Sequence, residues 1–247
     1  DTSLMVFEVE IGGVLKKFAL NMGNGVDGEL DPQRIQGGLI TEGMTNQGST
    51  FFDGGSIVCF VAGTHILTAS GEVAIEDLKV GDSVKTIEHG NQEIRWIGSV
   101  SVKSRGKFAP VKISAGALGE NSPSRDLFVS PAHRMVISGW RAELLFDAPE
   151  VLVPASALVN DSTITYSREN ATVEYFHIMF DNHEIVISNG APSESFNPTH
   201  DAIGNLSPES RDELLALFPE LCQSNGTYDS ALPTLSSAEA SVLAKLN

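Results

Sequence analysis

The chain has 247 residues, of which 41% are hydrophobic and 19% are charged, as in globular proteins that bury a full core. Its 16 basic and 32 acidic residues give a net charge of −16, which argues against a nucleic-acid partner and against binding to an anionic membrane surface. No apolar run reaches the length of a membrane span, and two cysteines cannot build a disulfide framework.

The first 58 residues predict an N-terminal segment with two parts. Residues 1–20 contain the apolar runs "SLMVFEVEI" and "VLKKFAL" on either side of two glycines, a pattern that predicts a β-hairpin. Residues 21–57 are rich in Gly, Asn and Asp, and we expect an extended leader there.

Residues 58–198 carry short alternating runs broken by turns, among them "THILTAS", "DLFVSPAHRMVIS" and "HEIVIS". Alternation of this kind predicts a mostly β fold with strands of a few residues. Residues 150–159, "EVLVPASALV", include a short possible helix but also Pro154.

Residues 199–247 change to helical signals. Ser207 and Pro208 match the N-cap and first position of a helix that Pro219 ends. Ser236 and Glu239 form a capping box at the start of a second helix. We expect two helices that pack on the β domain.

Cys59 lies between Val58 and Phe60, and a cysteine in such a position is most often a small buried hydrophobe. It becomes a nucleophile only beside a group that generates thiolate or handles the leaving group. His133 follows Ser130 within one turn, and a histidine beside a hydroxyl group in a tight turn can act as a general acid or base.

Two further histidines, His177 and His183, flank a turn late in the β region. Each is compatible with a packed or hydrogen-bonded structural histidine. Together with Cys59 and His133 they could also supply the three or four ligands of a zinc ion. The close-spaced ligand pairs typical of zinc sites are absent, so a metal-binding β protein stays as an alternative.

Three segments, taken together, resemble the Hint domains, the family of Hedgehog autoprocessing domains, inteins and bacterial intein-like domains. The first, "CFVAGTHILTASGEVAIEDLKVGDSV", looks like the opening block with its nucleophilic cysteine. The second, "VSPAHRMVI", is similar to the Thr-x-x-His block, with Ser130 in the threonine place. The third, "VEYFHIMFDNHEIVISNG", is similar to the late histidine block, and the sequence after it resembles a bacterial subgroup.

The resemblance implies a mostly β horseshoe with pseudo-twofold halves and a shared active site. It implies that Cys59 attacks the carbonyl of Val58, so that an amide becomes a thioester. His133 would then protonate the leaving amide nitrogen. Ser130 would hydrogen-bond the same peptide or orient the histidine.

The remaining roles that the resemblance implies are less direct. His183 would assist steps at the C-terminal side or position the scissile bond. His177 stands where inteins more often place an aspartate. Asp126 would orient a histidine or satisfy backbone donors, as local caps do.

One departure from the family argues against full splicing, because Glu194 and Ser195 replace the final His-Asn pair of inteins, and Pro198 follows the nearby Asn197. We therefore expect cleavage between Val58 and Cys59, without a cofactor or metal. The chain's own N-terminal segment is the substrate, and water or another nucleophile resolves the thioester.

The expected domains are a leader over residues 1–58, a Hint domain over 59–198 and a helical extension over 199–247. The subgroup resemblance and the acidic composition favour a secreted bacterial protein. The first functional alternative is a Hint fold without efficient activity that serves as a scaffold or recognition module.

Overall fold

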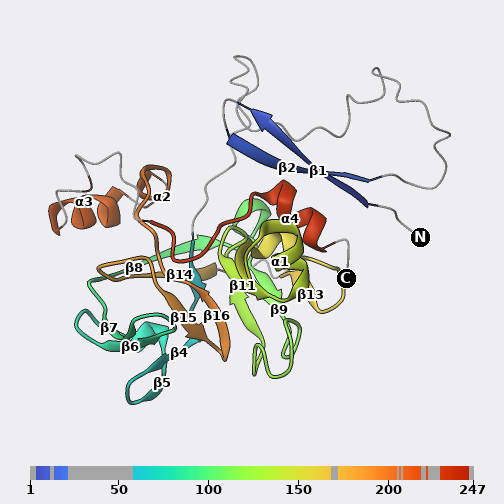
Figure 1. Ribbon diagram of the computed structural model, residues 1–247. Helices are drawn as coiled ribbons and strands as arrows, with labels where there is room; N and C mark the ends of the chain where they lie inside the picture. The colour runs from blue at the N-terminus through green and yellow to red at the C-terminus, as the bar shows by residue number, and fades with distance from the viewer. Residues whose placement is uncertain are drawn as a thin grey trace. The chain divides into compact units, whose positions relative to one another are not determined.

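The computed structural model describes residues 4–11, 14–21, 58–167, 172–204, 206, 208–217, 221 and 229–244. The chain divides into two units, Asp1–Thr50 and Phe51–Asn247. In the first unit, β1 (Leu4–Ile11) pairs antiparallel with β2 (Val14–Asn21), which confirms the predicted hairpin (Figure 1). The leader predicted over residues 21–57 lies outside the described residues, apart from the last residue of β2.

The second unit contains two antiparallel sheets. The six-stranded sheet has the order β13-β9-β10-β3-β14-β8. Its strands are β3 (Phe60–Val61), β8 (Trp96–Lys103), β9 (Val111–Ile113), β10 (Leu127–Val129), β13 (Ile164–Tyr166) and β14 (Thr172–Met179). The mostly β fold predicted from the short alternating runs is therefore confirmed.

The eight-stranded sheet has the order β12-β11-β16-β15-β4-β6-β7, and β5 pairs with β4. Its strands are β4 (His65–Thr68), β5 (Gly71–Ala74), β6 (Ser83–Thr86), β7 (Gly90–Glu93), β11 (Arg134–Ser138), β12 (Glu150–Pro154), β15 (Ile185–Ser188) and β16 (Ala191–Glu194). The possible helix at 150–159 is instead the strand β12 followed by a 3-10 turn, Ala155–Leu158, because residues 150–154 pair along their whole length with β11.

The chain passes directly from the six-stranded to the eight-stranded sheet three times, at β3–β4, β10–β11 and β14–β15. Cys59 immediately precedes β3, and the turn between β10 and β11 carries Ser130 and His133. His177 lies on β14, and His183 precedes β15. The fold therefore places all five of these residues at or next to the passages between the sheets.

The helices are α1 (Trp140–Phe146), α2 (His200–Gly204), α3 (Pro208–Leu217) and α4 (Ser237–Ala244). The last two are the helices predicted near the C-terminus, and the main-chain N–H groups of Ser236 and Glu239 form the expected reciprocal capping bonds with each other's side chains. Leu214 of α3 joins a buried cluster with Trp96 and Met179 of the six-stranded sheet. The C-terminal region thus packs on the β domain, while the three-part division of the chain stays a prediction.

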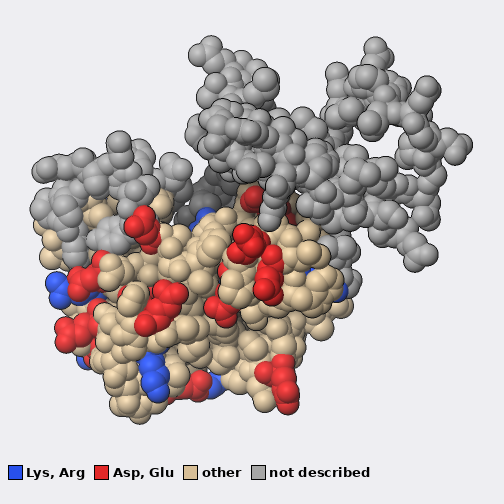
Figure 2. All heavy atoms as spheres, viewed as in Figure 1, with Lys and Arg blue, Asp and Glu red and all other residues tan. Residues whose placement is uncertain are grey.

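Acidic side chains form scattered patches on the face that Figure 2 shows, with fewer basic ones among them. No continuous basic stripe crosses the described part of that face. Among the described residues, no helix has the length and apolar character needed to cross a membrane.

Candidate active site

The peptide bond between Val58 and Cys59 is held inside the domain. Cys59 is completely buried and Val58 is 6% exposed. The Cys59 N–H donates to Ser130 Oγ at 3.0 Å, and the Ser130 N–H donates to the Cys59 carbonyl at 3.0 Å. Ser130 thus makes the first of its two expected contacts, on the peptide whose cleavage the sequence predicts.

His177 contacts both groups that the expected reaction would join. Its Nδ1 lies 2.7 Å from the Val58 carbonyl oxygen, and Cys59 Sγ lies 3.4 Å from its Nε2 and 3.5 Å from its Nδ1. A carbonyl oxygen only accepts, so Nδ1 carries the proton, and Nε2 of the neutral ring carries the lone pair. The ring can therefore donate to the carbonyl and accept from the thiol.

Burial sets the protonation states of this pair. It raises the pKa of the Cys59 thiol well above its ordinary value, and the hydrogen bond with Ser130 lowers it only in part. Burial also lowers the pKa of His177 to about 4, against the opposing effect of the hydrogen bond to Val58. At neutral pH the resting site holds a thiol and a neutral imidazole.

Two aromatic rings pack against the His177 imidazole. The Trp96 ring stacks on it with centroids 6.1 Å apart, and the Phe196 ring meets it edge-on at 5.3 Å. Both aromatic residues belong to the buried cluster that includes Leu214 of α3. Residues of α2 and α3 thus belong to the cluster that supports the ring in contact with Cys59.

Gly98 allows Trp96 to take this place, because a Cβ at position 98 would lie 2.5 Å from Trp96 Cζ2. Since that indole is buried, we expect Gly98→Ala to lower the free energy of unfolding by about 1–3 kcal/mol. A urea titration checks this. Gly204→Ala is the control, because nothing lies within 4 Å of its new Cβ. Equal midpoints for both variants and the wild type would contradict the packing described here.

His133 lies in the same turn as Ser130, to whose carbonyl its N–H donates at 3.1 Å. Its ring is fully buried and packs edge-on against Phe60, with centroids 4.4 Å apart. Neither ring nitrogen has a hydrogen-bond partner among the described residues. Burial lowers the pKa of His133 to about 4, although the charge of Glu194 opposes this shift. The ring is neutral at physiological pH, with both nitrogens available.

His183 is engaged on both sides by other groups. The Ala231 N–H donates to its Nδ1 at 3.1 Å, and its Nε2 lies 3.4 Å from Glu194 Oε2. Two residues after Ala231, the Pro233 carbonyl accepts the Leu152 N–H of β12. Neither of these contacts involves Val58 or Cys59, so they do not support the expected role of His183 at the scissile bond.

Glu194 is a completely buried carboxylate that sequence reasoning treated only as a departure from the intein ending. It accepts the Arg134 N–H at 2.9 Å and the Arg134 guanidinium at 3.1 Å. Burial alone would raise the pKa of Glu194, but His183 and Arg134 outweigh it and hold the pKa below its usual range. Glu194 is the last residue of the short strand Ala191–Glu194, and no local pattern in the sequence marks it as buried.

Asp126 lies apart from the histidines. It accepts the Ala115 N–H at 3.0 Å and pairs with Lys112 at 2.7 Å, and the hydrogen bond with Lys112 lowers its pKa. Of its two expected roles, these contacts favour the satisfaction of a backbone donor. Among the described residues, no group of three or more His, Cys, Asp or Glu side chains gathers as a metal site would require.

Comparisons with known proteins place residues 58–200 in one family. The chain is 17% identical to a bacterial intein-like domain from Clostridium thermocellum, with a TM-score of 0.40 over 57% of this chain and 99% of that one. It is also 17% identical to a DnaB intein from Synechocystis sp. PCC 6803, with a TM-score of 0.34 over 56% and 98%. No curated protein matches the chain. The sequence model of the Hint domain matches residues 58–200, more than half of the chain, and the protein therefore belongs to the Hint domain family.

Proposed function

We propose that this Hint domain cleaves its own chain between Val58 and Cys59 through a thioester. The observation that carries the proposal is the position of one buried imidazole, His177, against both the Val58 carbonyl oxygen and the Cys59 sulfur. Membership of the Hint family supports a self-processing domain in general. The contacts of His177 support this particular bond and this nucleophile.

The first step moves one proton and exchanges one bond. His177 Nε2 takes the thiol proton of Cys59 while Sγ attacks the Val58 carbonyl carbon. The resulting imidazolium stabilises the developing oxyanion through Nδ1–H, as preorganised donors do in acyl transfer. Because both reacting groups belong to one chain, no bimolecular encounter is needed.

The second step breaks the bond between the Val58 carbonyl carbon and the Cys59 nitrogen. That nitrogen needs a proton to leave, and His133 is the proposed donor. Ser130, which accepts the Cys59 N–H at 3.0 Å, holds the nitrogen in place. The thiol proton taken up by His177 passes to His133, whose imidazolium then gives a proton to the Cys59 nitrogen, so both rings end neutral. The products are a thioester of Val58 on Cys59 Sγ and a free Cys59 amine, and in net one proton has moved from sulfur to nitrogen.

Water or an added nucleophile then releases residues 1–58 from residues 59–247. Full splicing is not part of the proposal, because Glu194 is bound inside the domain by Arg134 and Pro198 follows Asn197.

The test is the intact mass of the purified wild type and of Cys59→Ala, each incubated with and without dithiothreitol. We expect thiol-stimulated cleavage at Val58–Cys59 in the wild type and none in the variant. A wild type that stays intact under every condition would favour the inactive Hint scaffold instead.

A further inference from the structure

The turn that carries Ser130 and His133 is held from several sides. Its main chain donates to Cys59 at one end, and the His133 carbonyl accepts the Ala155 N–H at 2.8 Å. The next N–H along the chain, that of Arg134, donates to the Glu194 carboxylate at 2.9 Å. The buried Glu194 carboxylate thus accepts the main-chain N–H of Arg134, the residue directly after His133.

The Glu194 carboxylate also joins the charged groups around His133. It binds the Arg134 guanidinium at 3.1 and 3.3 Å, and it lies 3.4 Å from His183 Nε2. Because Ala231 N–H donates to His183 Nδ1, the neutral His183 ring keeps its proton on Nε2, facing Glu194. Three elements, β11, β16 and the turn before β15, meet at this one carboxylate.

A buried carboxylate with these partners often adds no stability over an apolar core of the same shape. We propose that Glu194 is a positioning residue for the cleavage, which fixes the turn bearing His133 through the Arg134 main chain and supplies the negative charge that favours the protonated form of His133. The inference rests on the proposed function, since His133 is the proton donor there.

The electrostatic part of this role has a definite sign. The groups that act on the charge of His133 are Glu194, which favours protonation, and Arg134, His177 and His183, which oppose it. Cleavage needs Cys59 deprotonated and His133 protonated, whereas the resting site has the reverse. This exchange takes no proton from solvent, so the reactive fraction is constant between the two pKa values and grows when the pKa of His133 rises.

Two charge-removing variants therefore have opposite expected effects. Glu194→Gln removes the favourable charge and should slow cleavage at pH 7 by about tenfold, the size of one charge several ångströms away in a protein interior. Arg134→Gln keeps the backbone N–H that binds Glu194 and removes an opposing charge, so it should accelerate cleavage. The double variant should return toward the wild-type rate.

The experiment combines two readouts on the full chain. Dithiothreitol-induced cleavage is timed at pH 7 for the wild type, both single variants and the double variant. The pKa of His133 is measured by NMR titration of its imidazole in the Cys59→Ala background, where no cleavage is needed. We expect the pKa to lie below about 4 with Glu194→Gln and above it with Arg134→Gln.

The outcomes separate the two proposals. A wild type that does not cleave overturns the proposed function, while the NMR titration still decides the role of Glu194. Equal His133 titration in all four proteins, or slower cleavage in both single variants, would overturn the positioning role and leave Glu194 as a structural ion pair. If Glu194→Gln does not fold, Arg134→Gln decides by itself: an unchanged pKa of His133 and an unchanged cleavage rate in that variant would overturn the positioning role of Glu194.

Discussion

Replacement of His177 by phenylalanine is expected to slow thiol-induced cleavage at Val58–Cys59 by about 10²–10³-fold, the usual cost of losing one oxyanion donor. Phenylalanine keeps an aromatic ring against Trp96 and Phe196 but has neither nitrogen. The Val58 carbonyl, now bonded to Nδ1 at 2.7 Å, loses its donor, and the thiol loses its base. The rate of appearance of residues 59–247, followed by mass spectrometry, measures the effect.

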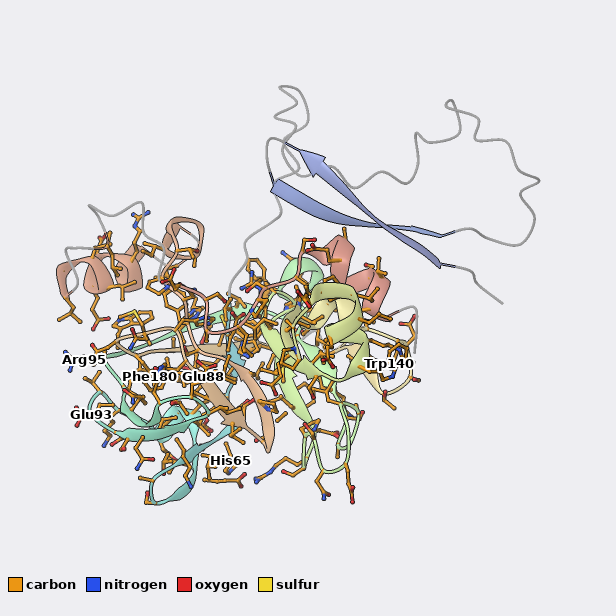
Figure 3. All side chains as sticks on the ribbon, in the orientation of Figure 1. His65, Glu88, Glu93, Arg95, Trp140 and Phe180 are labelled. Carbon is orange, nitrogen blue, oxygen red and sulfur yellow. The ribbon has the colours of Figure 1, made fainter. Side chains whose placement is uncertain are left out.

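His177→Asn separates the two functions of the ring. Its side-chain amide can still donate toward the Val58 carbonyl but cannot accept the thiol proton and return it, so its rate should fall between those of the wild type and His177→Phe. His65→Asn is the control, because His65 contacts the Gly63 carbonyl and is the first residue of β4, low in the molecule as Figure 3 shows it. Equal rates for His177→Phe and His65→Asn would rule out a catalytic role for His177.

Acid is expected to destabilise the domain well before its carboxylates titrate. His133 and His177 have pKa values of about 4 in the folded protein, below the ordinary 6.5. A folded state that disfavours the charged ring loses stability as pH falls from 6.5 toward 4, and keeps it in full above 6.5. Each histidine accounts for about 3 kcal/mol of this loss.

Urea midpoints of Cys59→Ala at pH 7, 6, 5 and 4 measure this effect without interference from cleavage. The midpoint should fall steadily over that range. Adding His177→Phe removes one of the two titrating rings and should remove about half of the slope, whereas adding His65→Asn should leave the slope unchanged. A midpoint that is constant from pH 7 to pH 5 would contradict the burial of two neutral histidines.

The sequence could predict the class of the fold because its signals are local. Short alternating runs predict the strands, and the cap residues Ser207 and Ser236 predict the starts of α3 and α4. The helix α1 escaped prediction because seven residues are too few to show a helical period. Residues 150–154 form a strand only because β11 lies beside them.

The site was predictable where it rests on neighbours in the chain, and unpredictable where it rests on distant contacts. Ser130 could be assigned to the Cys59 peptide from a family resemblance. The contact of His177 with Val58 depends on the antiparallel register that pairs Phe176 with Phe60, which no local pattern reveals. The partner of His183 is a backbone N–H at Ala231, 48 residues away.

Trp140 is an exposed aromatic residue outside the candidate active site. It is 64% exposed on α1, with the Arg141 guanidinium 4.9 Å from its ring centroid. Figure 3 shows it on the other side of the view from Glu93 and Arg95. None of the contacts of Cys59, His133 or His177 described above involves it.

The most direct test of the central claim is the chemical form of the new C-terminus after treatment with hydroxylamine. A thioester between Val58 and Cys59 is trapped as a hydroxamate, so residues 1–58 of the wild type should carry that added mass, and Cys59→Ala should yield no such fragment. Release of residues 1–58 only as the free acid at an unchanged rate in hydroxylamine, or equal release from Cys59→Ala, would contradict the thioester mechanism.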